Sequence, residues 1–119
     1  MQTVIGAMEK QIITIEAIRE KLFLQKVKVL PHAIESMFKR GYTREDLIHA
    51  IMYGEITTEQ FIYGQNRYVV ESVDVDFNPI VLIVTQDREQ PDFYAVITVF
   101  PPIKEKFKHR INEQRKVVA

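Results

Sequence analysis

Residues 31–48 read Pro-His-Ala-Ile-Glu-Ser-Met-Phe-Lys-Arg-Gly-Tyr-Thr-Arg-Glu-Asp-Leu-Ile, and the rest of the chain is organised around this stretch. Pro31 suits the first turn of a helix, because its fixed φ matches the helix and its missing N–H would be unpaired there anyway. Gly41 can adopt the left-handed conformation that ends a helix. Thr43 is a good N-cap, and Asp46 follows three residues later in a variant of the capping box. The stretch therefore predicts two short helices joined by a tight turn.

Apolar side chains recur with the helical period in both predicted helices. They are Ala33, Ile34, Met37 and Phe38 in the first helix, and Leu47, Ile48, Ile51 and Met52 in the second. Each set covers one side of its helix, which we expect to face the core. Further upstream, residues 3–26 predict one longer helix with an apolar stripe, and residues 27–30 predict a short extended segment. The members of that stripe are Ile5, Met8, Ile12, Ile15 and Leu22.

The second half of the chain has the pattern of a sheet. Strands are expected over residues 55–63, 67–75, 80–85 and 93–100, separated by turn-forming residues. Because the connections are short, these strands should form an antiparallel meander. Residues 103–116 carry Ile103, Phe107 and Ile111 at helical spacing and predict a C-terminal helix. The predicted fold is therefore α+β, with N-terminal helices, a four-stranded antiparallel sheet and a C-terminal helix.

Length and composition indicate one globular domain of 119 residues. We divide it into an N-terminal extension (1–29), a core (30–102) and a basic tail (103–119). Sixteen lysines and arginines balance sixteen acidic residues, which argues against a broad nucleic-acid-binding surface. The absence of cysteine excludes disulfides and thiolate chemistry. We expect a cytoplasmic protein without cofactor or membrane association, because no apolar run approaches the ~18 residues of a membrane span.

Several short motifs of the core, taken in order, resemble a widespread bacterial family of small uncharacterised domains. The family pattern begins His-Ala-x-x-Arg-Met-x-x-Arg-Gly-Ile-Ser. The matching residues here are His32-Ala33-x-x-x-Met37-x-x-Arg40-Gly41-Tyr42-Thr43-x-Glu45-Asp46, Ile51-x-x-Gly54-Glu55-Ile56, Arg67-Tyr68, Pro79-Ile80 and Ile97-Thr98-Val99-Phe100-x-Pro102. The family is similar in architecture to ribonuclease toxins of the RelE and BrnT kind. This chain departs from it at Ser36, where the family usually has arginine, and at Val81, where many members have histidine.

The resemblance implies a site for RNA cleavage without a metal. Such cleavage needs a base for the ribose 2′-hydroxyl, an acid for the leaving oxygen and cations on the phosphate. His32 is the candidate base, and Arg40 and Arg67 are candidates to clamp the phosphate. Tyr68 and Tyr94 are candidates to stack a base or donate a proton. The three histidines lack the spacing of metal ligands, so no metal site is expected.

Structural roles are open for the same residues. His32 would then pack at the start of its helix, Arg40 would pair with a carboxylate such as Glu45, and the tyrosines would fill faces of the sheet. Two functions follow. One is a ribonuclease-toxin-like module, active or degenerate. The other is a non-catalytic interaction protein that forms a homodimer through its N-terminal helix or binds an antitoxin-like partner. Whether the chain is an enzyme stays open at this point.

Overall fold

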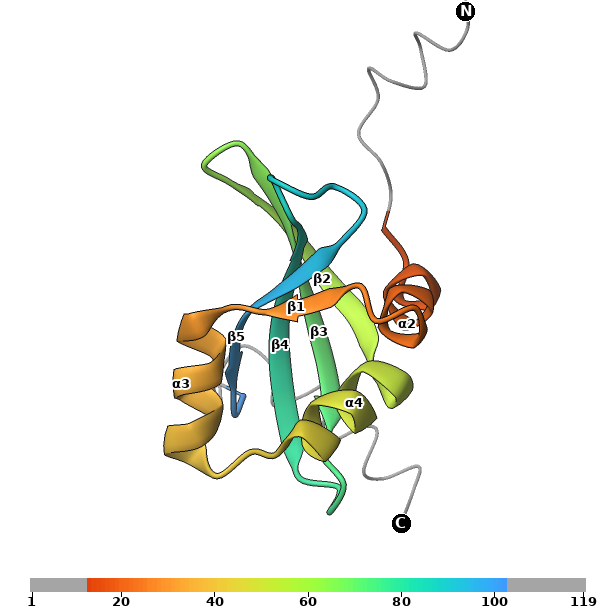
Figure 1. The fold of residues 1–119 in the computed structure, drawn as a ribbon. Helices are drawn as coiled ribbons and strands as arrows, with labels where there is room; N and C mark the ends of the chain where they lie inside the picture. The colour runs from red at the N-terminus through yellow and green to blue at the C-terminus, as the bar shows by residue number, and fades with distance from the viewer. Residues whose placement is uncertain (1–12, 103–119) are drawn as a thin grey trace, which may run out of the picture.

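The computed structural model describes residues 13–102, which form an α+β fold with three helices and a five-stranded mixed sheet (Figure 1). In chain order the elements are α2 (Ile15–Phe23), β1 (Val27–Val29), α3 (Pro31–Arg40), α4 (Arg44–Tyr53), β2 (Glu55–Ile62), β3 (Gln65–Val73), β4 (Pro79–Gln86) and β5 (Tyr94–Phe100). The prediction of one helix over residues 3–26 is wrong in its described part, because Thr14 is an extended N-cap that starts α2 and the helix ends at Phe23. Residues 1–12 and the whole predicted C-terminal helix lie outside the described residues.

The turn between α3 and α4 has the predicted chemistry. Gly41 follows α3 in the left-handed conformation, with φ of +76°. At the start of α4 the Thr43 hydroxyl accepts a hydrogen bond from the Asp46 N–H, at 3.1 Å. The Asp46 carboxylate in turn accepts one from the Thr43 N–H, at 2.9 Å. This reciprocal capping box fixes where the second helix begins, and the prediction of a paired-helix unit is confirmed.

The sheet differs from the predicted four-stranded antiparallel meander. Its order is β1-β5-β4-β3-β2, and β1 pairs with β5 in parallel, with Val27 opposite Tyr94. The Leu30 N–H adds a hydrogen bond to the Val96 carbonyl, at 3.0 Å. The four strands β2 to β5 are antiparallel neighbours, as expected. The extended segment predicted over residues 27–30 contains β1, but its pairing with β5 was missed, because a parallel partner is distant in sequence and no local turn signals the pairing.

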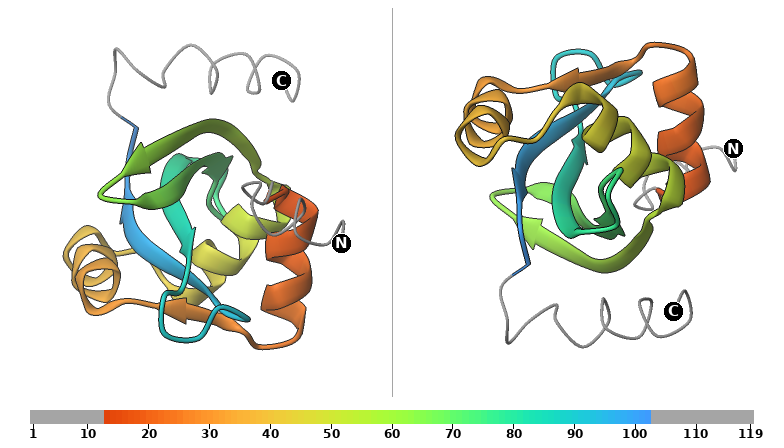
Figure 2. Two further views of the ribbon diagram at one scale, coloured as in Figure 1. Left: turned by 90° about the horizontal axis from the view of Figure 1, so that it is seen from above. Right: turned by 90° about the horizontal axis from the view of Figure 1, so that it is seen from below.

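The three helices lie on one side of a strongly twisted sheet (Figure 2). Side chains alternate along β3 and β4, so each strand contributes to both faces. The helix face carries Tyr68 and Val70 from β3 and Ile80, Leu82 and Val84 from β4, all of which belong to the buried core. The far face carries Arg67, Val69 and Glu71 from β3, opposite Thr85, Ile83 and Val81 from β4. None of the described helices is long and apolar enough to cross a membrane.

Helix α3 buries less of its apolar side than its sequence predicts. Ala33 is fully buried, whereas Ile34 is 55% exposed and Phe38 is 86% exposed. The reason is position, since α3 packs mainly against β5 rather than across the middle of the sheet. Helix α4 packs over β3 and β4 instead, and its Leu47 and Ile51 are buried. The outer apolar side of α3 therefore remains at the surface.

Candidate functional site

Arg67 lies on the far face of the sheet, where its side chain borders a pocket of about 290 Å³. Strand pairing sets Arg67 directly opposite Thr85 of the neighbouring strand β4. The pocket is also bordered by Leu30, Gln65, Asp87, Arg88, Glu89, Ala95 and Ile97. Most of these side chains are polar or charged, in contrast to the apolar helix face. The lining is therefore mixed, with the apolar residues Leu30, Ala95 and Ile97 beside the polar and charged ones.

The hydrogen bonding of the Arg67 side chain is incomplete. Its Nε atom is buried and has no hydrogen-bond partner within the described part of the chain. Buried polar groups are nearly always hydrogen-bonded, so a buried guanidinium nitrogen without a partner needs an explanation. An arginine offers five N–H donors in a planar fork that fits carboxylates and phosphates. An anionic ligand in the pocket would supply the missing acceptor.

One acidic residue of the pocket, Asp87, is already hydrogen-bonded to other groups of the protein. Asp87 Oδ2 accepts hydrogen bonds from the Gln90 N–H, at 2.8 Å, and from Lys28 Nζ, at 3.1 Å. Both hydrogen bonds lower the pKa of the Asp87 carboxyl, and the one from the Gln90 N–H has the larger effect. Arg88 donates from Nη2 to the Tyr63 carbonyl, at 2.7 Å, and no ion pair joins it to a carboxylate within residues 13–102. The lining of the pocket thus combines two arginines, Arg67 and Arg88, with two acidic residues, Asp87 and Glu89.

Helix α3 begins at the rim of the same pocket. Its N-cap residue is Leu30, which borders the pocket, and His32 is the second residue of the helix. Among the described residues, no side chain caps this helix start, and its first turn holds no acidic residue. The first backbone N–H groups of a helix lack internal partners and carry partial positive charge. Helix α3 therefore starts beside the Arg67 pocket, and the exposed His32 lies in its first turn.

Arg40 lies away from this pocket. It is the last residue of α3, whereas His32 is the second. The two residues are eight positions apart in the helix, which at 1.5 Å per residue is about 12 Å along the axis. The structure therefore does not gather His32, Arg40 and Arg67 around one phosphate. A role for Arg40 in a shared site stays a prediction.

Tyr68 and Tyr94 belong to the helix face, opposite Arg67. Both are buried members of the apolar core. Burial is the main cause that raises the pKa of the Tyr68 hydroxyl, and the neighbouring Glu59 charge adds to it. Burial likewise raises the pKa of the Tyr94 hydroxyl. These tyrosines pack the sheet against the helices, and the structure does not bring them to the Arg67 pocket.

Of the residues that line the pocket, only Arg67 was predicted from the sequence, and Arg88 and Thr85 are two of those that were missed. Arg88 lies in the polar loop between β4 and β5, where no periodic pattern marks its direction. Thr85 ends an apolar run and was counted as part of a buried strand. Only the strand register, which pairs Thr85 with Arg67, brings it to the pocket.

The described residues offer no metal centre. Within residues 13–102, no group of three or more histidine, aspartate or glutamate side chains could hold a metal ion. His49 has a packing role. Its Nδ1 atom lies 2.9 Å from the Val73 carbonyl oxygen, and its ring contacts those of Tyr53 and Phe77. It sits at the boundary between core and surface, as expected from its helical position.

Comparisons with known proteins show a family but no activity. No curated protein and no solved structure matches this chain. Residues 29–101 do match a family model, over more than half of the chain and nearly the same stretch as the predicted core of 30–102. The chain therefore belongs to the family described as Domain of unknown function (DUF4258).

Proposed function

We propose that this domain binds the phosphodiester backbone of single-stranded RNA on the far face of its sheet, as a ribonuclease-like module. The observation that supports the proposal is the Arg67 guanidinium, whose buried Nε has no partner among the described residues. A phosphate oxygen would complete its hydrogen bonding, and charge-assisted hydrogen bonds of this kind are about twice as strong as neutral ones. Arg88 and the start of α3 border the same pocket and offer further N–H donors.

The chemistry that this arrangement could support is limited. His32 would accept the proton of a ribose 2′-hydroxyl, whose oxygen then attacks phosphorus and forms a 2′,3′-cyclic phosphate. The 5′-oxygen leaves and must take a proton, and we assign no acid for this step. Ser36 and Val81 replace the family arginine and histidine, which removes two more groups that could help. We therefore expect RNA binding to be retained and cleavage to be slow or absent.

Binding should depend only weakly on salt. The pocket of about 290 Å³ has room for one or two phosphates, and the chain has no net charge. Each phosphate contact on a single strand contributes about −0.7 to the slope of log K against log salt concentration. Two contacts predict a slope of about −1.4, far shallower than that of a protein that tracks a long backbone.

The test compares RNA binding by two matched arginine variants. Fluorescence anisotropy with a labelled single-stranded RNA measures the Kd of the wild type, Arg67→Met and Arg40→Met. We expect Arg67→Met to weaken binding about tenfold or more, because it removes charge-assisted hydrogen bonds. Arg40→Met removes the same charge from the other end of α3 and should leave the Kd nearly unchanged. Equal binding by the wild type and Arg67→Met would overturn the proposal.

A second measurement separates an active module from a degenerate one. The same RNA is incubated with the wild type and with His32→Ala, and the products are resolved on a gel. Cleavage that is lost in His32→Ala and ends in a cyclic phosphate assigns the histidine as base. No cleavage by either protein, with binding intact, identifies a module that binds RNA without cutting it.

A second candidate function is that of a protein-interaction module, either a homodimer or a partner of an antitoxin-like protein. The observation that favours it is the exposed apolar side of α3, which bears Ile34 and Phe38. Large apolar patches on a soluble domain often mark protein interfaces. This function does not exclude RNA binding, because the two surfaces involve different residues.

A further inference from the structure

An apolar groove of about 620 Å³ opens on the helix side of the molecule. It is bounded by the end of α2, by β1, and by the facing sides of α3 and α4. Its apolar lining includes Leu22, Val29, Ile34, Met37, Phe38 and Leu47. A single aliphatic residue at the surface needs no explanation, but a contiguous lining of this kind does.

The side chains beside this groove are unusually exposed for their size. Phe38, on the α3 wall, is 86% exposed. Ile34, one helical turn before Phe38, is 55% exposed. Aromatic side chains contribute most to protein interfaces because they bury a large area. The groove and its rim thus have the composition of a site for an apolar helix.

We propose that the groove binds residues 1–12 of a second copy of this chain, so that two copies exchange their N-terminal segments. The segment carries Ile5, Met8 and Ile12, whose spacing places them on one side of a helix. Twelve helical residues extend about 18 Å, a length suited to an elongated groove between helices. A closed exchange between two copies uses the same contact twice, as a two-fold symmetric dimer requires.

The positive charges at the groove favour residues 1–12 over residues 103–116 as the bound segment. Residues 103–116 also carry apolar side chains at helical spacing, but with six lysines and arginines against two glutamates. The charged residue of the groove lining is Arg44, and Lys39 and Arg40 end the neighbouring helix α3. A strongly basic helix would be repelled there. Residues 1–12 carry one glutamate, Glu9, and one lysine, so the groove tolerates them.

The position of Ile13 relative to the groove favours residues 1–12 of a second copy over the same residues of the same chain. Ile13 is buried in the core just before α2, whereas Leu22, near the other end of α2, borders the groove. The nine residues of α2 span about 13 Å. A helical segment that turned back along α2 would therefore bring only its first residues to the groove. Met8 and Ile12 would lie beside α2 instead, and a second copy has no such restriction.

The first test measures the oligomeric state of full-length variants by light scattering across a range of concentrations. The wild type should be a dimer. Phe38→Asp and Met8→Asp should weaken dimerisation at least tenfold, the one in the groove and the other in the segment. Tyr63→Asp is the matched control, because Tyr63 is 87% exposed in the turn between β2 and β3, outside the groove. A monomeric wild type, or a dimer unaffected by Phe38→Asp, would overturn the proposal.

The second test places a disulfide between segment and groove, which the cysteine-free chain allows without background. Met8→Cys and Phe38→Cys are made as single variants, mixed in equal amounts and oxidised. A covalent heterodimer on a non-reducing gel supports the proposal. The double variant then distinguishes the source of the segment. Cross-linked dimers support exchange between copies, whereas an internally bridged monomer, or no bridge at all, overturns it.

Discussion

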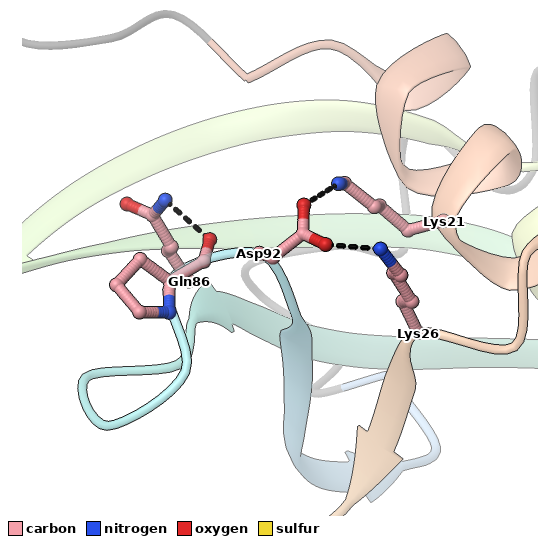
Figure 3. A network of polar contacts seen from close by, with 5 residues as sticks. Lys21, Lys26, Gln86 and Asp92 are labelled. Carbon is pink, nitrogen blue, oxygen red and sulfur yellow. Dashed lines mark hydrogen bonds and ion pairs between the residues drawn. The ribbon is translucent and has the colours of Figure 1, made fainter.

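Lys21 Nζ lies 2.5 Å from a carboxylate oxygen of Asp92, so that helix α2 is tied to the loop that leads into β5 (Figure 3). Lys26, just before β1, binds the other carboxylate oxygen. The same loop is held from its other side by Gln86, which donates to the Pro91 carbonyl at 2.7 Å. This cluster joins two segments that are far apart in sequence, residues 21–26 and residues 86–92.

The cluster should give folding a pH dependence in the acid range. Hydrogen bonds from Lys21 and Lys26 lower the pKa of Asp92 to about 2. The unfolded chain has the ordinary value near 3.8, so the stabilisation is present above that pH and is lost as pH falls toward 2. We expect Asp92→Asn to reduce the loss of stability between pH 4 and pH 2, measured as the urea midpoint at each pH.

Glu89→Gln serves as the control for this pH experiment. It removes an exposed carboxylate from the same loop but leaves both lysine contacts of Asp92 in place. Some acid dependence should persist in Asp92→Asn, because the pKa values of Asp46 and Asp87 are also lowered. An unchanged acid slope in Asp92→Asn would show that this cluster adds nothing to folding.

Asp46 should contribute more to stability than its capping role alone. Besides capping α4, its Oδ1 accepts the Val75 N–H at 3.2 Å, which ties the helix start to the end of β3. We expect Asp46→Ala to lower the free energy of unfolding by about 2–3 kcal/mol, the sum of a cap and a buried hydrogen bond. Thr43→Ala loses the cap only and should lose about 1 kcal/mol. Equal losses in chemical denaturation would assign no energy to the Val75 contact.

Neighbouring atoms pack so closely around Gly54 that a side chain would not fit there. A Cβ atom there would lie 2.6 Å from the Ala50 carbonyl oxygen and 2.7 Å from Ser72 Cβ. Neither neighbour is a flexible chain end, so Gly54→Ala should destabilise the fold by about 3 kcal/mol, in the range of overpacked cores. Gly64→Ala provides the comparison. Its Cβ would meet no atom within 4 Å among the described residues, but its φ of +71° should cost about 1 kcal/mol. Thermal unfolding of both variants would reveal the order, and a milder effect at Gly54 would contradict this packing.

Local signals in the sequence were sufficient for the unit of α3 and α4, but not for the bounds of α2, which was predicted over residues 3–26. Pro31, Gly41, Thr43 and Asp46 each have one dominant structural use, and together they located both ends of the turn. The pairing of β1 with β5 has no such signal, because its residues are separated by two helices and three strands. The position of α3 relative to the sheet has no local signal either. Its apolar side was therefore expected to be buried, whereas α3 lies beside the sheet and leaves Phe38 exposed.

The candidate site was predictable only in part. Arg67 and Tyr68 were both assigned to the predicted site, yet alternation along a strand sends neighbouring side chains to opposite faces. That rule was available from the sequence and separates the two residues. The approach of Arg88 to Arg67 was not available, because it depends on the shape of the loop after β4. Tertiary structure alone assembles that part of the pocket.

Arg67 should be unnecessary for folding if it serves a ligand. Its buried Nε lacks a hydrogen-bond partner among the described residues, and such a group costs about 1–3 kcal/mol. Methionine has a similar length and no buried donor, so Arg67→Met should leave the free energy of unfolding unchanged or raise it by about 1 kcal/mol. Thr85→Val is the matched control in the same pocket, since the Thr85 hydroxyl donates to the Asn66 carbonyl at 2.7 Å. That variant should lose about 1 kcal/mol. Urea unfolding measures both, and a clear destabilisation by Arg67→Met would mean that the arginine supports the fold rather than a phosphate.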